Sequence, residues 1–124
     1  MEFISTANIS ATAADLKSRL TIRELPHWCG SIEEVLSEAQ ATGEIYCVWG
    51  TFNIHREDLS HGVRFTFPRC SNALQWTVTR GPQSSTPHVI IHLTINRTEH
   101  DPDYVESIRQ FLADWKTGLE AHWS

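Results

Sequence analysis

The sequence predicts an α+β protein, a two-layer sandwich with a four-stranded antiparallel meander and helices on one face. Three observations lead to this class: four strand-like segments between residues 45 and 95, helical apolar spacing over 32–41, and the same spacing over 102–120. A chain of 124 residues has the length of one domain. We therefore expect a single domain, 1–124, with the small and polar residues 1–11 frayed.

Two helices are predicted before the strands. Residues 12–20 suit a short helix, and Ser31 resembles an N-cap with Glu34 completing a capping box. Gly43 then supplies a stop, which predicts a helix over 32–41. The apolar residues of this second helix are Ile32, Val35, Leu36 and Ala39.

The last predicted element is a long amphipathic helix over 102–120. Asp101 is a suitable N-cap, Pro102 suits the first helical position, and Asp103 places negative charge in the first turn. Apolar residues then recur every three or four positions, which predicts a helix lying on an apolar layer. They are Val105, Ile108, Leu112, Trp115 and Leu119.

The four strands are predicted at 45–54, 61–67, 74–80 and 88–95. These segments are rich in β-branched and aromatic residues. The short segments between them favour an antiparallel meander over parallel crossovers.

Alternation along these strands predicts one apolar and one open face. The apolar face pairs Phe52, Gly50 and Val48 with Val63, Phe65 and Phe67, then with Val78, Trp76 and Leu74, and finally with Val89, Ile91 and Leu93. One row of the open face holds Trp49, Thr66, Gln75 and His92, and the next holds Thr51, Arg64, Thr77 and Ile90. Such a face is often solvated and binds nothing, but a tryptophan and an isoleucine, Trp49 and Ile90, are unusual on a face without a binding role.

Composition narrows the classes of function. The net charge of −5 argues against nucleic acid and anionic membranes as partners. Three cysteines make a disulfide framework improbable, and no secretion signal begins the sequence, so a cytoplasmic protein is expected. No phosphate loop or cofactor motif is present, and we expect no cofactor. Neither Cys29 nor Cys70 is accompanied by the groups that a nucleophile needs.

The first hypothesis is a non-enzymatic binding or accessory protein that uses the open face. Trp49 is its expected anchor and Arg64 its orienting group, with hydrogen bonds from Gln75 and His92 beside Thr66 and Thr77. The partner is another protein or a second copy, giving a homodimer. The alternative is a small-molecule binder or enzyme whose pocket lies between the sheet and the N-terminal segment. Arg64, Gln75 and His92 line that pocket, and residues 27–29 form a lid.

A third and weaker hypothesis is a metal site in the 55–61 segment, which is predicted to be a hairpin loop. His55, Glu57, Asp58 and His61 are ligand types that divalent metals accept. Polar loops commonly contain such residues, and their spacing matches no known ligand pattern, so a solvated loop is the plainer interpretation.

Overall fold

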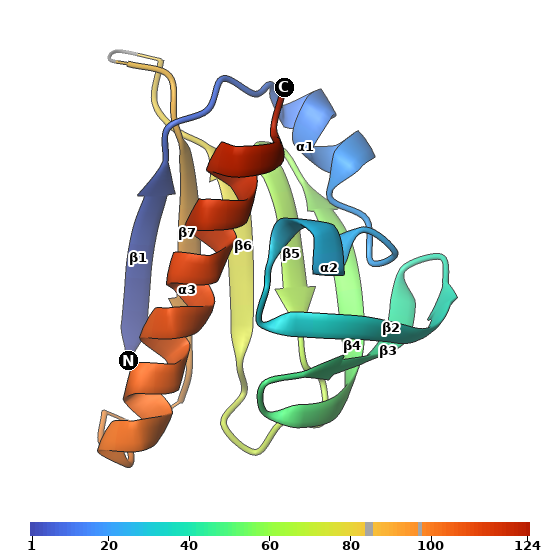
Figure 1. The fold of residues 1–124 in the computed structure, drawn as a ribbon, viewed down its shortest axis with the longest axis vertical. Coiled ribbons are helices and arrows are strands. Elements are labelled where there is room, and N and C mark those ends of the chain that lie inside the picture. The colour runs from blue at the N-terminus through green and yellow to red at the C-terminus, as the bar shows by residue number, and fades with distance from the viewer. Residues whose placement is uncertain (84–85, 97) are drawn as a thin grey trace.

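The computed structural model describes residues 1–83, 86–96 and 98–124, which form one large antiparallel sheet and three helices (Figure 1). The sheet has the order β1-β7-β6-β5-β4-β3-β2, so the predicted α+β class is confirmed but the predicted four strands are seven. The elements are β1 (Glu2–Ala7), α1 (Ala13–Arg19), α2 (Leu25–Trp28), β2 (Ile32–Ala39), β3 (Thr42–Cys47), β4 (Gly50–Leu59), β5 (Gly62–Thr66), β6 (Gln75–Arg80), β7 (Val89–Thr94) and α3 (Pro102–His122).

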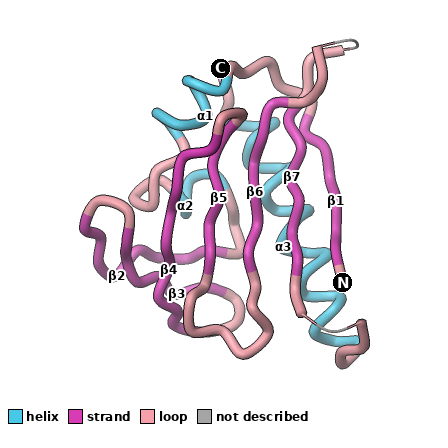
Figure 2. Tube along the Cα trace, turned by 180° about the vertical axis from the view of Figure 1, so that it is seen from behind, coloured by secondary structure: helices cyan, strands magenta, loops and turns pink. Residues whose placement is uncertain are grey.

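The helices lie on one face of the sheet. In Figure 1 α3 crosses in front of β7 and β6, with α2 beside it, and the view from behind in Figure 2 shows uncovered strands. α3 packs against β1 and β7, and α1 packs against β5 and β6. The two-layer arrangement is therefore confirmed for the described residues. None of their helices is long and apolar enough to cross a membrane.

The predicted first and last helices are present. Thr12 accepts from the backbone N–H of Asp15, whose side chain accepts from the Thr12 N–H, so a capping box begins α1. Asp101 caps α3 through the N–H of Asp103. The apolar stripe of α3 is buried from Ile108 to Leu119, as the spacing predicts, whereas Val105 is only partly buried.

The predicted helix over 32–41 is wrong: these residues form β2 and the turn that follows it. β2 pairs with β3, and its register shifts twice, between Ile32 and Glu34 and between Val35 and Ser37. Such bulges break the two-residue alternation of a strand and leave apolar residues three or four apart. The Ser31 hydroxyl also does not cap a helix; it donates to the Asp114 carboxylate on α3.

Two further predictions along the chain are corrected. Residues 1–11 are not frayed throughout, since Glu2–Ala7 pair with β7 as an edge strand. The predicted strand over 45–54 is the hairpin of β3 and β4, which turns at Val48 and Trp49. Gly50 has a φ of 111°, in the left-handed region that favours glycine. Val48, predicted to face the core, is 56% exposed in this turn.

The later strands keep their predicted faces. Phe65 pairs with Trp76 as predicted, whereas Trp76 pairs with Leu93 instead of Ile91. That shift of two residues leaves each side chain on its predicted side. The predicted pairing of Phe52 with Val63 is wrong, because Val63 pairs with Asp58.

Aromatic rings fill the space between the sheet and α3. The Trp76 ring lies 5.2 Å from that of Phe65, 5.0 Å from Phe111 and 6.3 Å from Trp115, between ring centres. The indole N–H groups of Trp76 and Trp115 are buried without a partner in the described chain. A buried donor without an acceptor costs about 1–3 kcal/mol. The packing of the two indole rings therefore contributes more to stability than hydrogen bonds from their N–H groups would. The candidate sites described below lie at the margins of this core.

Candidate functional site

Trp49 joins the β3–β4 turn to α3. Its indole N–H donates to the Ser107 hydroxyl oxygen at 2.8 Å, and its ring centre lies 5.0 Å from that of Phe111. Ser107 in turn donates to the Tyr104 carbonyl at 2.6 Å. Because both ends of the indole are engaged, the ring is held at one position at this end of the molecule.

A hollow of about 330 Å³ opens beside Trp49, and we call it the mouth pocket. Its floor includes Phe52 and Phe67, whose rings stack at 4.8 Å with an angle of 9° between their planes. Trp49 meets the rings of Phe67 and Tyr104 edge-on, at 6.5 and 6.1 Å. Flat apolar walls with few polar groups are typical of small-ligand sites. The lining residues are Trp49, Phe52, Phe67, Arg69, Cys70, Ser71, Asn72, Leu74 and Tyr104.

The β5–β6 connection forms a well-defined wall of this pocket. The Cys70 N–H donates to the Phe67 carbonyl at 3.1 Å, and the Ala73 N–H donates to the Cys70 carbonyl at 3.0 Å, giving two successive turns. Ala73 has a φ of 50°, which is uncommon for a residue other than glycine. The Asn96 side chain ties the loop to the segment after β7 by donating to the Ser71 carbonyl at 3.0 Å.

The polar groups of the mouth pocket are few. Burial raises the pKa of the Tyr104 hydroxyl, and a hydrogen bond from the Asn72 side chain partly offsets that rise. Cys70 contributes a thiol, but no histidine or carboxylate is among the described lining residues. The pocket therefore offers apolar contact and hydrogen bonds, without the base that a thiol nucleophile requires.

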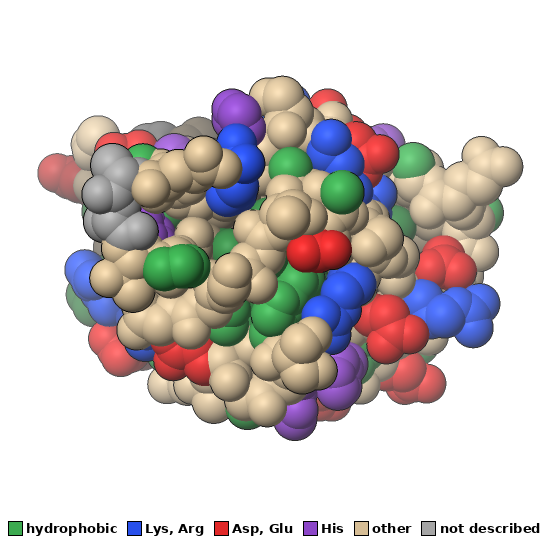
Figure 3. Space-filling model, turned by 90° about the horizontal axis from the view of Figure 1, so that it is seen from above, with side chains coloured by type: hydrophobic (Ala, Val, Ile, Leu, Met, Phe, Trp, Pro, Cys, Tyr) green, Lys and Arg blue, Asp and Glu red, His purple; other side chains and the backbone are tan. Residues whose placement is uncertain are grey.

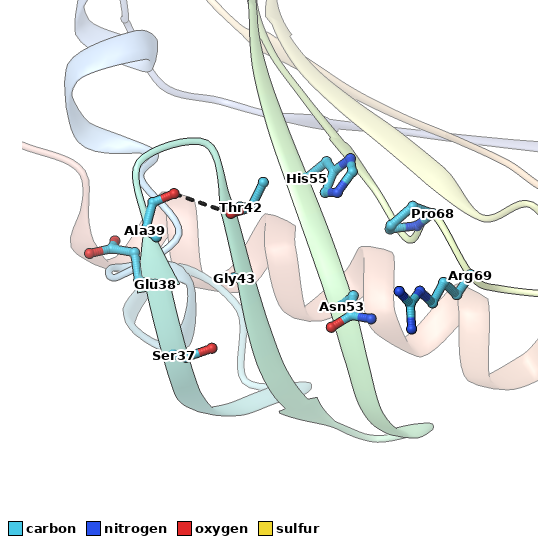
Figure 4. Close-up of a pocket in the computed structure, with 9 residues that line it drawn as sticks. All are labelled: Ser37, Glu38, Ala39, Thr42, Gly43, Asn53, His55, Pro68 and Arg69. Atoms are coloured by element: carbon cyan, nitrogen blue, oxygen red, sulfur yellow. Dashed lines mark hydrogen bonds between the residues drawn. The ribbon is translucent and has the colours of Figure 1, made fainter.

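A second hollow, of about 450 Å³, adjoins the first, and we call it the polar pocket (Figure 4). Arg69 lines both pockets. In Figure 4 its guanidinium points toward Asn53 on β4, with His55 two residues further along that strand. The lining residues are Ser37, Glu38, Ala39, Thr42, Gly43, Asn53, His55, Pro68 and Arg69.

The predicted open face exists, although its rows differ from the prediction. Arg64, Thr77 and His92 lie side by side in one row, which ends at Ile4 of β1. A second row contains Thr66 and Gln75 beside Thr94. The uncovered strands are visible in Figure 2.

Two residues of this face already have acidic partners. The Arg64 Nε donates to Glu57 Oε1 at 2.7 Å, and this bond lowers the pKa of the Glu57 carboxyl. The His92 Nε2 lies 2.8 Å from Glu2 Oε2. Arg64 and His92, which were expected to bind a partner, therefore already interact with carboxylates of the same chain.

Trp49 does not belong to the open face, which corrects the prediction that made it the anchor there. The turn at residues 48–49 places it on the helix side, against α3. The most exposed isoleucine of the open face is Ile4 at its β1 edge, which is 64% exposed.

The four proposed metal ligands are not brought together. His55, Glu57 and Asp58 lie within β4, not in a loop, and alternation directs Asp58 to the opposite face from the other two. Asp58 pairs with Arg56 at 2.9 Å and Glu57 with Arg64 at 2.7 Å. His61 lies apart from them in the β4–β5 turn. Among the described residues, no group of three potential ligands lies close enough to hold an ion.

The pocket predicted between the sheet and the N-terminal segment is placed differently. A hollow of about 250 Å³ lies between residues 10–12 and residues 80–83 and 87–88. Arg64, Gln75 and His92 do not line it, because they point away from the helices. Residues 27–29 end α2, which packs against α3 and β2, and form no lid over this hollow.

Comparisons with known proteins support the fold. No protein-family model matches the sequence, and no curated protein matches it. A START superfamily protein from Mycobacterium smegmatis is similar with a TM-score of 0.71 at 12% identity, over 97% of this chain and 94% of that one.

Two Bacillus structures are also similar. An uncharacterized protein from Bacillus thuringiensis has a TM-score of 0.71 at 12% identity, over 98% of this chain and 97% of that one. The protein XoxI from Bacillus cereus has a TM-score of 0.70 at 10% identity, over 97% and 93%. At these identities the likeness concerns the fold alone. The chain thus has a fold seen in a START superfamily protein.

Apart from Trp49, which was expected on the open face, the residues of the mouth pocket were not predicted as site residues from the sequence. Phe52, Phe67, Arg69 and Tyr104 come from three separate parts of the chain, and no spacing connects them. One local signal was available: Gly50 inside an apparent strand favours a bend or turn, which would have moved Trp49 from the open face.

Proposed function

We propose that this protein binds a small, flat, largely apolar molecule in the mouth pocket. The observation that carries the proposal is the arrangement of Trp49, Phe52, Phe67 and Tyr104 around one hollow. Planar ring faces bury flat ligands with little loss of side-chain freedom, because the rings are already held by packing. The shared fold with a START superfamily protein is compatible with this proposal, which rests on the pocket itself.

Binding without chemistry is the better-supported form of the proposal. Trp49 already donates to Ser107, and Asn72 already bonds to Tyr104. No described lining residue of the mouth pocket is a histidine or carboxylate that would act as a general base. We keep a cytoplasmic location in the proposal, since Cys29, Cys47 and Cys70 are all unpaired.

A neutral fluorescent dye, N-phenyl-1-naphthylamine, tests this function directly. The dye should bind saturably at one site per chain, because its fused rings match the apolar walls. A Ser71→Trp variant places an indole at the rim of the pocket and should weaken binding at least tenfold. Ser60→Trp, in the exposed turn after β4, is the matched control and should bind normally.

Non-saturable dye binding would contradict the proposal. So would equal affinity for the wild type and the Ser71→Trp variant, provided that both unfold at similar urea concentrations.

Self-association or protein binding through the open face remains a second candidate function. The observation that favours it is the exposure of Ile4 at the end of the Arg64, Thr77 and His92 row. Light scattering of the wild type and an Ile4→Glu variant tests it. Dimers that dissociate in the variant would support this function, whereas a strict monomer at high concentration would remove the homodimer.

A further inference from the structure

We infer that the ligand of the mouth pocket is an aromatic anion, and that Arg69 binds its negative group. This inference rests on the proposed function and adds the chemical class of the ligand. It depends on one structural coincidence: the cation that borders the apolar pocket also borders a polar one.

Arg69 is available for a ligand. No hydrogen bond, ion pair or ring contact engages its side chain within the described residues. Three other described arginines are ion-paired: Arg23 with Glu38, Arg56 with Asp58 and Arg64 with Glu57. A guanidinium presents donors in a planar fork that matches carboxylate, sulfonate and phosphate oxygens.

The backbone around Arg69 is organised in advance. Pro68 and Arg69 occupy the centre of the turn that the Cys70 N–H closes onto the Phe67 carbonyl. The loop is tied to the segment after β7 through Asn96. Less ordering entropy is therefore lost when a ligand binds than for an arginine on a loose loop.

The polar pocket adds groups suited to an anion. Asn53 and His55 stand on the same face of β4 and border the hollow with Arg69 (Figure 4). One carboxylate, Glu38, also lines it, and that carboxylate already accepts from the Arg23 backbone N–H at 3.0 Å and pairs with its guanidinium. Arg69 is thus the uncompensated charge at the junction of the two pockets.

The net charge of the chain sharpens the test. At −5, the protein as a whole repels anions, so non-specific attraction cannot produce a preference for a negative dye. The opposite end of the molecule, seen in Figure 3, shows acidic and basic side chains interspersed and only small separate apolar areas. A preference for an anion would therefore be local to the site.

A matched pair of dyes measures this preference. 8-Anilinonaphthalene-1-sulfonate carries the ring system of N-phenyl-1-naphthylamine plus one sulfonate. At low salt the wild type should bind the sulfonate about tenfold more tightly than the neutral dye, since a charge-assisted hydrogen bond at a partly exposed site is worth roughly that factor. Added salt should reduce the preference, because exposed charges are screened.

Substitution of the arginine separates the inference from the proposed function. Arg69→Met should lower the ratio of sulfonate to neutral-dye affinity from about ten to about one, whatever it does to the affinity for the neutral dye itself. Arg109→Met is the matched control: Arg109 is exposed on α3, lies over the Phe3 ring away from both pockets, and its loss changes the net charge equally. This control should keep the preference.

Each outcome decides one of the two ideas. If the neutral dye binds at the site that Ser71→Trp blocks but the sulfonate binds no more tightly, the inference of an anionic ligand is wrong. It is also wrong if the preference for the sulfonate persists in Arg69→Met. In both cases the proposed binding function of the mouth pocket still stands. Failure of both dyes to bind overturns the proposed function and this inference with it.

Discussion

The indole of Trp49 and the hydroxyl of Ser107 join the β3–β4 turn to the second turn of α3 across 2.8 Å. Their positions lie 58 residues apart in the chain. This single bond orients the ring that forms one wall of the mouth pocket. It therefore links the stability of this end of the molecule to the shape of the candidate site.

Substitution of Ser107 by alanine should lower the free energy of unfolding by about 0.5–1.5 kcal/mol, the usual worth of one hydrogen bond. Urea unfolding followed by circular dichroism measures this loss. Thr117→Ala, at an exposed position of the same helix, is the control and should cost nothing. If Ser107→Ala is as stable as the wild type, the indole is held by packing alone.

Substitution of Trp49 by alanine should lower the free energy of unfolding by about 2–3 kcal/mol. This is less than the 3–5 kcal/mol typical of a fully buried tryptophan, because Trp49 is half-buried. The open-face hypothesis predicts instead a normally stable variant with weakened association. Thermal unfolding and light scattering of one preparation distinguish the two.

Substitution of Gly118 by alanine should destabilise the protein strongly, by about 2 kcal/mol or more. A Cβ at this position of α3 would lie 1.9 Å from the Trp28 carbonyl oxygen, so α2 and α3 would have to separate. Gly30→Ala is the matched control, because the nearest side-chain atom to its Cβ would lie at 3.8 Å. Equal melting temperatures for the two variants would contradict this close approach.

Substitution of Arg56 by methionine should cost about 1.5–3 kcal/mol. Its guanidinium donates to the Leu20 carbonyl at 2.7 Å and to the Lys17 carbonyl, two groups at the C-terminal end of α1 that lack helical partners. Asp58→Asn removes only the negative charge that faces Arg56. Because the Asp58 side chain is 60% exposed, this change should cost less than about 0.5 kcal/mol. Denaturant titration of both variants gives the comparison.

Thiol alkylation should discriminate between Cys29 and Cys70. Burial raises the pKa of the Cys29 thiol to about 12, so very little of it is the reactive thiolate at pH 8. Iodoacetamide at pH 8 should therefore modify the half-buried Cys70 first and leave Cys29 intact until the chain unfolds. Mass spectrometry of tryptic peptides locates the label. Because Cys70 lines the mouth pocket, a bound dye should also slow its modification.

The raised pKa of Cys29 also predicts a loss of stability in alkaline solution. The folded chain holds this proton more tightly than the unfolded chain, whose thiol titrates near 9.0. The stabilising contribution is thus present in full below pH 9 and falls as the pH rises toward 12. Between pH 8 and pH 10.5, the free energy of unfolding should fall more steeply for the wild type than for Cys29→Ala.

Local sequence determined the elements whose stabilising groups lie within a few residues of one another. The helix α3 follows from the Asp101 cap, Pro102 and an apolar stripe, and all three act within the helix itself. The buried sides of β5, β6 and β7 follow from alternation, so even a two-residue shift in pairing left Trp76 and Leu93 in the core.

Only the tertiary structure determined the conformation of segments whose side chains and backbone bind groups far away in the sequence. Ser31 resembles a helix cap, but its hydroxyl is used by Asp114, 83 residues away, while β3 supplies partners for the backbone of β2. Bulges then hide the alternation of β2, because each extra residue moves the pattern toward helical spacing. The mouth pocket belongs to this second class: Trp49, Phe67 and Tyr104 meet only because the curved sheet and α3 converge at one end.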